Sequence, residues 1–299
     1  MFDEPPAEDD SVTVERRSPE DVFGLLGNGV RIEILRVLGE TPEKPLSFSE
    51  LRERADIDDS GNFNYHLEKL LGSFVRKDGD YELTHAGEQI VGAMLAGTYT
   101  ADATVDAIPL DWDCLLCGGA MVAEYFRERA RIHCRACEKG AVFPFPPGSL
   151  DQFDRDELPV AFARWLRHLV QQTTAGFCHV CAGRVDGRLE RHPGGTESDP
   201  KPTQITFECR QCGGGMRFSG STLVTHHPEV EGFFLDHGLD LLSGHPSRAW
   251  SRLDRFDSQI VANDPPRVEI IFAHEGETIT AEIAPDATVR NVQRHTTDR

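Results

Sequence analysis

The sequence predicts an α+β protein in which helices fill the first third of the chain and short strands with paired cysteines follow. Apolar residues recur at helical spacing up to about residue 97, apart from two short runs around Asp78-Gly79. All eight cysteines lie beyond residue 113, as four C-x-x-C pairs. Two strand-like runs near the C-terminus meet at Glu275-Gly276. We therefore expect an N-terminal winged helix-turn-helix, two small zinc-ribbon-like β modules joined by an amphipathic helix, and a C-terminal β-hairpin.

The charge balance is strongly acidic. The 299 residues carry a net charge of −19 from 50 acidic and 31 basic side chains, and only 5 of the basic ones are Lys. This composition resembles that of proteins from salt-accumulating haloarchaea, and an ordinary acidic cytosolic protein is the alternative. At about 1 M salt the Debye length is only about 3 Å, so the acidity does not exclude a nucleic-acid partner.

The N-terminal residues 1–17 begin MFDEPPAEDD and are expected to form a disordered acidic tail. They lack the apolar core of a secretory signal. No run of about 18 apolar residues occurs, so no membrane contact is expected. With no export signal the chain is expected to be cytoplasmic, where paired cysteines bind metal more often than they form disulfides.

Residues 18–97 are expected to form one domain. Ser18-Pro19 begins a first helix, Val30–Leu38 a second, and Ser47-Phe48-Ser49-Glu50 is a capping box that begins a third. A turn at 58–61 leads into a fourth helix that contains GNFNYHLEKLL. Asp78-Gly79 then supplies a type I′ turn between two strands. Two short helices joined by a tight turn and followed by a hairpin predict a winged helix-turn-helix.

The helix that follows the hairpin, THAGEQIVGAMLAG, has an apolar face that a domain of about 80 residues cannot cover. We expect this face to pair with a second copy of the chain. The predicted homodimer interface comprises Ile90, Val91, Met94 and Leu95.

Four motifs occur here in a fixed order: LLGNGVRIEILRVL, SFSELRERA, NYHLEKL and ELTHAGEQIV. In that order they resemble the winged-helix repressors of the ArsR type, in the form common in haloarchaea, over about residues 18–97. Many members of this group also carry a Cys-rich C-terminal half. The resemblance implies a homodimer that binds double-stranded promoter DNA. Residues 1–113 contain no Cys, so the metal-sensing site of the family is not implied here.

The fourth helix is the expected recognition helix, with Phe63, Leu67 and Leu70 facing inward. For His66, packing against a neighbouring helix is an equal alternative to DNA contact. The wing is weaker evidence for DNA binding, because the carboxylates of Asp78 and Asp80 at its tip would repel the phosphates that its basic residues could contact. The candidate DNA-binding residues are Ser60, Asn62, Asn64, Tyr65, His66 and Lys69 on the helix, and Arg76 and Lys77 on the wing.

The cysteine pairs predict two metal sites, each with four thiolates. C-x-x-C…C-x-x-C is the spacing of zinc ribbons, and a zinc ion with four thiolate ligands is closed and structural. We expect two Zn²⁺ ions with local pairing, although ligands crossed between the two halves remain an alternative. The predicted ligands are Cys114, Cys117, Cys134 and Cys137 in the first site, and Cys178, Cys181, Cys209 and Cys212 in the second.

The rest of the chain is divided by composition. The expected segments are a linker at 98–111, a first zinc-ribbon-like module at 112–148, a helical connector at 149–174, a second module at 175–226, and a C-terminal helix and β-hairpin region at 227–299. The hairpin is expected to pair Arg267–Ala273 with Thr278–Ala284.

The sequence indicates a sequence-specific DNA-binding transcriptional regulator, and the resemblance makes a repressor the first expectation. No phosphate loop, nucleophile elbow or two-His metal helix is present, so no enzyme is expected. One alternative is a general transcription factor or RNA polymerase adaptor resembling archaeal transcription factor E, with contacts through the C-terminal half. Another is a protein-interaction scaffold.

Overall fold

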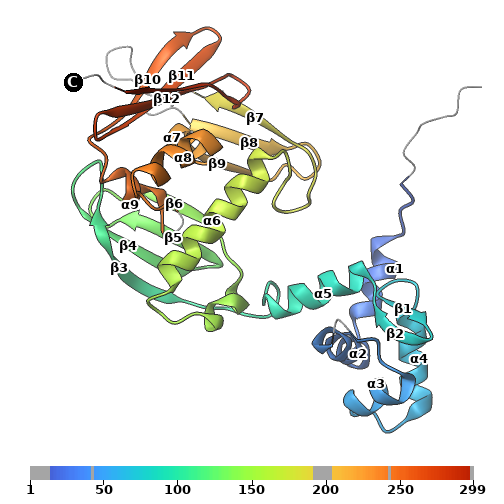
Figure 1. Ribbon diagram of the computed structural model, residues 1–299. Coiled ribbons are helices and arrows are strands. Elements are labelled where there is room, and N and C mark those ends of the chain that lie inside the picture. The colour runs from blue at the N-terminus through green and yellow to red at the C-terminus, as the bar shows by residue number, and fades with distance from the viewer. Residues whose placement is uncertain (1–13, 42–43, 191–203, 242–243, 297–299) are drawn as a thin grey trace, which may run out of the picture. The chain divides into compact units, whose positions relative to one another are not determined.

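A computed structural model describes residues 14–41, 44–190, 204–241 and 244–296 (Figure 1). The chain is mixed α and β, and it divides into two compact units, Met1–Thr100 and Ala101–Arg299. Part of the expected acidic tail, residues 1–13, and the whole run HPGGTESDPKP (192–202), between the two cysteine pairs of the second module, lie outside the described residues.

The first unit consists of helices and one hairpin. Its elements are α1 (Pro19–Phe23), the 3-10 helix η1 (Gly24–Leu26), α2 (Gly29–Glu40), α3 (Phe48–Arg54), α4 (Ser60–Leu70), β1 (Val75–Asp78), β2 (Asp80–Leu83) and α5 (His85–Leu95). Local chemistry sets the helix starts, because the side chains of Asn28 and Asp59 accept backbone N–H groups of α2 and α4. Ser47 and Glu50 form the expected capping box of α3.

One apolar core holds the first unit together. Ile34 and Leu35 of α2, Leu51 of α3 and Phe63 of α4 are fully buried in it. Leu46 and Tyr81 exchange backbone hydrogen bonds of 3.0 and 2.8 Å, so the segment before α3 is joined to the hairpin. The helices, the hairpin and their order agree with the expectation from sequence.

The second unit contains two cysteine-bearing sheets. The first is antiparallel in the order β3-β4-β5-β6 and the second in the order β7-β8-β9 (Figure 1). The strands are β3 (Val105–Asp113), β4 (Ala120–Phe126), β5 (Arg129–Cys134), β6 (Gly140–Pro144), β7 (Val185–Glu190), β8 (Gln204–Cys209) and β9 (Gly215–Ser219).

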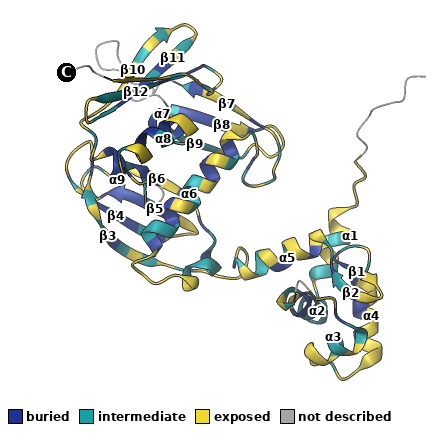
Figure 2. Ribbon diagram, in the orientation of Figure 1, coloured by how far each residue is buried: buried dark blue, intermediate teal, exposed yellow. Residues whose placement is uncertain are grey.

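Between these sheets in sequence come the 3-10 helix η2 (Pro147–Gln152) and α6 (Leu158–Thr174). The buried face of α6 packs on the core of the first sheet (Figure 2). Its Phe162 ring lies 6.2 Å from that of Tyr125 and 4.9 Å from that of Phe145. The predicted connector is therefore one wall of the first module's core.

The C-terminal region contains more helices and strands than expected. Helices α7 (Gly220–Thr225), α8 (Pro228–Asp236) and α9 (Pro246–Trp250) precede a four-stranded antiparallel sheet. Its strands are β10 (Arg255–Asn263), β11 (Pro266–His274), β12 (Glu277–Ile283) and β13 (Val289–Thr296). Apolar side chains of β11 and β12 share one core with the second cysteine module.

Two expectations need correction. The C-terminal hairpin is present as β11–β12, but β10 and β13 extend it to four strands. The predicted linker at 98–111 is only partly a linker, because β3 begins at Val105 and pairs with β4. The acidic and proline-containing sequence of β3 carries little strand signal. This strand is therefore defined by its backbone pairing with β4, which a local sequence pattern does not reveal.

Candidate metal centres and candidate nucleic-acid interface

The eight cysteines form two local clusters, so the crossed ligand set is excluded. Cys114, Cys117, Cys134 and Cys137 make up the first, and Cys178, Cys181, Cys209 and Cys212 the second. Within each cluster all Sγ atoms lie within 4.8 Å of one another, and no Cys pair is a disulfide.

The separations of the sulfur atoms fit a tetrahedral metal ion. Two Sγ–Sγ distances in the first cluster are 3.7 Å (Cys114–Cys137) and 3.5 Å (Cys117–Cys134). The corresponding distances in the second cluster are again 3.7 and 3.5 Å. Four sulfurs at the Zn–S distance of about 2.3 Å would be roughly 3.8 Å apart. The structure therefore brings together two sets of four thiols that could each hold one metal ion.

The same backbone turn occurs at all four C-x-x-C pairs. In each, the N–H of the residue after the second Cys donates to the carbonyl of the first Cys, at 2.8 to 3.0 Å. That residue has a positive φ in every case: 69° at Gly118, 58° at Glu138, 55° at Ala182 and 70° at Gly213. The turn brings both sulfurs of a pair to one side.

Backbone N–H groups also point at the sulfurs. Ala136 donates to Sγ of Cys134 at 3.3 Å, and Gln211 donates to Sγ of Cys209 at 3.4 Å. Such bonds stabilise the thiolate that a metal ion requires.

Two glycines show that the second module repeats the first. A Cβ atom on Gly140 would lie 2.1 Å from the carbonyl oxygen of Ile132, and one on Gly215 would lie 2.1 Å from that of Phe207. Each glycine is three residues after the last Cys of its cluster. Strands β4-β5-β6 thus correspond to β7-β8-β9, and β3 is an addition to the first module.

The thiol pKa values describe clusters that suit a cation. Backbone N–H donation, first from Cys137, lowers the pKa of Cys134 to about 7. The pKa of Cys117 is raised to about 12, because hydrogen bonds with neighbouring thiols outweigh the lowering effect of the Gly119 N–H. Cys209 and Cys181 repeat this pair of shifts in the second cluster. Since the thiols of a cluster cannot all ionise by themselves, a bound cation would displace protons from them.

The predicted DNA-binding residues on α4 divide into exposed and buried ones. Asn62, Asn64, Tyr65 and Lys69 are exposed on one helix, with Tyr65 55% exposed. His66 is only 9% exposed, and its Nδ1 lies 3.4 Å from Nη1 of Arg31. The packing alternative therefore describes His66 better than DNA contact does.

Several of the exposed groups already have partners. The amide of Asn64 donates to Oε1 of Glu68 at 2.9 Å. The Nζ atom of Lys69 lies 5.6 Å from the centre of the Tyr65 ring. Ser60 opens α4, but the carboxylate of Asp59 accepts the N–H groups of Gly61 and Asn62 at 2.9 and 3.0 Å. A carboxylate at this helix end makes it a poorer phosphate site than the sequence indicated.

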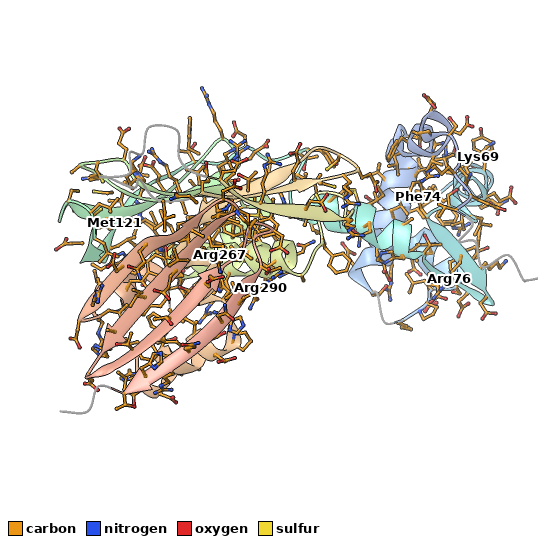
Figure 3. The ribbon with its side chains drawn as sticks, turned by 90° about the horizontal axis from the view of Figure 1, so that it is seen from above. Lys69, Phe74, Arg76, Met121, Arg267 and Arg290 are labelled. Atoms are coloured by element: carbon orange, nitrogen blue, oxygen red, sulfur yellow. The ribbon has the colours of Figure 1, made fainter. Side chains whose placement is uncertain are left out.

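The hairpin residues also have neighbours. Arg76 pairs with Glu82 at 2.7 Å, and Lys77 lies 4.9 Å from the centre of the Tyr81 ring. Figure 3 shows Lys69 and Arg76 in the same unit as Phe74, which is buried in its core.

The four residues of the predicted dimer interface are in different environments. Val91 is buried in the core of the first unit, while Ile90 and Met94 are half-buried against that core. Leu95 is 69% exposed. Most of this apolar face is thus covered by the unit itself, more than the sequence suggested.

Part of each metal centre could not be read from the sequence. Gly118 and Gly213 directly follow a C-x-x-C pair, which is a visible turn signal. Glu138 and Ala182 occupy the same left-handed position without any such signal.

No helix among the described residues is long and apolar enough to cross a membrane.

A helical unit with one hairpin, followed by two repeated four-cysteine modules on a shared plan, defines a two-part candidate metalloprotein. The chain belongs to the family described as domain of unknown function DUF7351, whose model matches residues 111–289. A second model, domain of unknown function DUF7347, matches residues 19–94. No curated protein and no solved structure matches the chain. The two matched regions lie within the two compact units.

Proposed function

We propose that this protein is a sequence-specific DNA-binding transcriptional regulator of the ArsR type, acting as a repressor. In this proposal residues 18–97 form a winged helix-turn-helix, and the second unit carries two structural zinc ions. The observation that carries the proposal is the outer face of α4, where Asn62, Asn64, Tyr65 and Lys69 are exposed on a helix that follows α3 and precedes a hairpin.

The chemistry of this face suits DNA. Asn side chains can bond an adenine edge with both their donor and their acceptor, and Lys and Tyr can reach phosphates. The hydrogen bond from Asn64 to Glu68 would have to break before Asn64 could contact a base. DNA sequences whose bases bond the Asn64 amide more strongly than Glu68 does would therefore be preferred. Arg31 beside His66 adds a cation behind the helix.

Zinc is the metal that this ligand set favours. Four thiolates in a tetrahedron are typical of structural zinc, and they leave no position for a reacting water. When bound, the ion would supply cross-links between strand ends. The protein backbone holds the thiols in position, through the C-x-x-C turns and the N–H bonds to sulfur. The proposal includes a reducing compartment, the cytoplasm, and eight free thiols that are not paired as disulfides support it.

The test is a binding titration with the chain's own upstream DNA and a scrambled duplex of equal length. We expect Asn64→Ala to lose about 1–3 kcal/mol on the upstream DNA and to discriminate less between the two duplexes. Lys69→Ala serves as the matched control on the same helix, because loss of a phosphate contact weakens both duplexes about equally. An equal loss with Asn64→Ala on both duplexes, or no discrimination by the wild type, contradicts base reading.

Salt gives the same titration a second readout. Each phosphate neutralised by a protein contributes a slope of about −0.9 to the dependence of log affinity on log salt. With so few lysines and a net charge of −19, we expect a shallow slope and binding that persists in molar KCl.

A second candidate is an RNA polymerase adaptor resembling archaeal transcription factor E. It is favoured by the exposed carboxylates of Asp59, Glu68, Asp78 and Asp80 on and beside the proposed DNA face. An adaptor would co-purify with polymerase and protect no discrete promoter segment. A pure protein-interaction scaffold would neither co-purify with polymerase nor protect a discrete promoter segment.

A further inference from the structure

The second unit contains a cavity of about 410 Å³ that the proposed DNA-binding role does not use. It lies where four parts of this unit meet. They are the first cysteine module with Cys114 and Met121, α6 with Leu166, the β9–α7 segment with Phe218 and Ser221, and the C-terminal region with Trp250 and Ile270. Figure 3 places Met121 on the sheet of the first module.

The floor of this cavity is apolar. Met121, Leu166, Trp250 and Ile270 line it and are buried. The charged residues that line it, Asp113, Lys139 and Arg217, are all solvent-exposed and therefore belong to its rim. Among the described residues, no buried acidic or basic side chain lines the interior, and the buried Cys114 would be engaged as a thiolate by its own metal ion. A charged ligand would therefore lose its hydration with little compensation.

One wall carries a group of hydroxyls. Oγ of Ser219 lies 2.8 Å from Oγ of Ser221 and 2.9 Å from Oγ1 of Thr222. Three hydroxyls offer three donors, and these two contacts use only two of them. At least one O–H and several lone pairs are thus available to a ligand on a wall that lines the cavity.

His245 adds a neutral polar group to the lining. Its Nδ1 accepts the backbone N–H of Ser247 at 3.3 Å and lies 2.8 Å from Oγ of Ser247. The ring proton therefore belongs on Nε2, which makes that atom a donor. Burial lowers the pKa of His245 to about 4, so the ring is uncharged at neutral pH.

From this geometry we propose that the cavity is a binding site for an uncharged small molecule, mainly apolar and about two rings in size, that carries one hydroxyl or carbonyl group. A dry cavity of about 150 Å³ holds one benzene ring, so about 410 Å³ accommodates roughly two. The apolar floor would take the rings, and the hydroxyl wall or His245 would take the polar group. A bound molecule would touch the first cysteine module and the C-terminal region together.

The methionines provide a direct readout. Of the four in the chain, Met121 and Met216 line the cavity, whereas Met94 lies in the first unit. Full-length, zinc-loaded protein labelled with ¹³C at the methionine methyl groups would be titrated with 2-naphthol, a neutral two-ring alcohol. We expect saturable shifts of the Met121 and Met216 signals, an unshifted Met94 signal, and a dissociation constant on the order of 0.1 mM.

Two further probes test the assigned chemistry. Naphthalene lacks the hydroxyl and should bind more weakly than 2-naphthol. Naphthalene-2-sulfonate carries a charge and should bind more weakly still. The proposal is overturned if no saturable shift occurs, if Met94 shifts as much as Met121, or if the sulfonate binds as tightly as the alcohol.

Two variants test the location. Ala141→Trp places an indole on the cavity wall and should abolish binding. Glu229→Trp, at an exposed position of α8 that does not line the cavity, is the control that should retain it. Ser221→Ala removes one oxygen and keeps a small side chain, so it remains informative if Ala141→Trp does not fold. It should weaken 2-naphthol binding about 2- to 10-fold and leave naphthalene unchanged. Unchanged 2-naphthol binding in both folded variants would refute the assignment.

Discussion

At the scale of single residues, His226 couples the fold of the second unit to pH. It follows α7, and its Nδ1 is buried without a hydrogen-bond partner among the described residues. Burial lowers the pKa of His226 to about 4, and the positive charge of Arg167 on α6 adds to this effect. The unfolded chain, with a pKa near 6.5, therefore binds a proton that the folded chain excludes.

The sign of the pH dependence follows. A depressed folded-state pKa gives stability that is complete above about pH 6.5 and is lost as the pH falls through about 4. Between pH 8 and pH 5 we expect this group to reduce the free energy of unfolding by about 2 kcal/mol. His226→Gln should remove that part of the pH dependence, as measured by denaturant unfolding of zinc-saturated protein at both pH values.

The control for this prediction is His85→Gln, which makes the same substitution at an exposed side chain on α5. Parallel stability curves for wild type and His226→Gln across this pH range would show that His226 is not buried in its neutral form.

Residue identity predicts the metal clusters better than it predicts the α4 surface. Cysteine has few roles in a reducing compartment, so the spacing of the four C-x-x-C pairs is enough to predict that neighbouring pairs form two four-cysteine sites. Whether His66 faces DNA or the core depends on the rotation of α4 against α2, and the structure buries it beside Arg31. The Asp59 cap was equally hidden, because Asp59 and Ser60 are both good capping residues and only the backbone decides between them.

At the scale of elements, α5 carries the strongest prediction about assembly. Val91 already packs within the first unit, and a Cβ on Gly39 would lie 2.5 Å from Cγ1 of Val91, so α2 and α5 are in close contact. Leu95 is the exposed remainder of the apolar face, next to half-buried Met94. We expect a second copy of the chain to cover these two residues and Ile90.

Leu95→Glu is the cleanest test of that dimer, since it alters an exposed position and leaves the core intact. A carboxylate buried at the interface without a partner is costly, so the variant should be monomeric and still folded. Light scattering in high salt measures the mass. Gln89→Glu, on the polar side of α5, should remain dimeric, and a monomeric wild type would contradict the prediction.

Helices with a clear apolar face could be placed from sequence, whereas two outer strands of the C-terminal sheet could not. Strand β12 is buried in alternation, β11 carries a buried apolar run, and the two supply core residues such as Phe272 and Ile279. Strands β10 and β13 are mostly exposed, so they lack the alternation that indicates a strand. Pairing with β11 and β12 defines them, and pairing is not encoded in a local pattern.

At the scale of the whole molecule, the division into two units separates the candidate metal centres from the proposed DNA-binding part. Every cysteine belongs to Ala101–Arg299, and the first unit has its own core. In the second unit, Cys114 and Cys134 belong to the core with α6, and Cys178 and Cys209 belong to the core with the C-terminal sheet. Loss of metal should therefore destabilise the second unit and spare the first.

We expect two zinc ions per chain by elemental analysis, and one in either Cys117→Ser or Cys212→Ser. These cysteines are a matched pair, because each is the exposed member of its cluster and Ser preserves its size. Since structural zinc stabilises small modules by about 10–16 kcal/mol, each variant should expose its own module. Hydrogen exchange should rise over β4–β6 in Cys117→Ser and over β7–β9 in Cys212→Ser, while α2–α5 stay protected in both. Two metal ions in either variant, or a first unit that unfolds together with the second, would show that the clusters or the units are not independent.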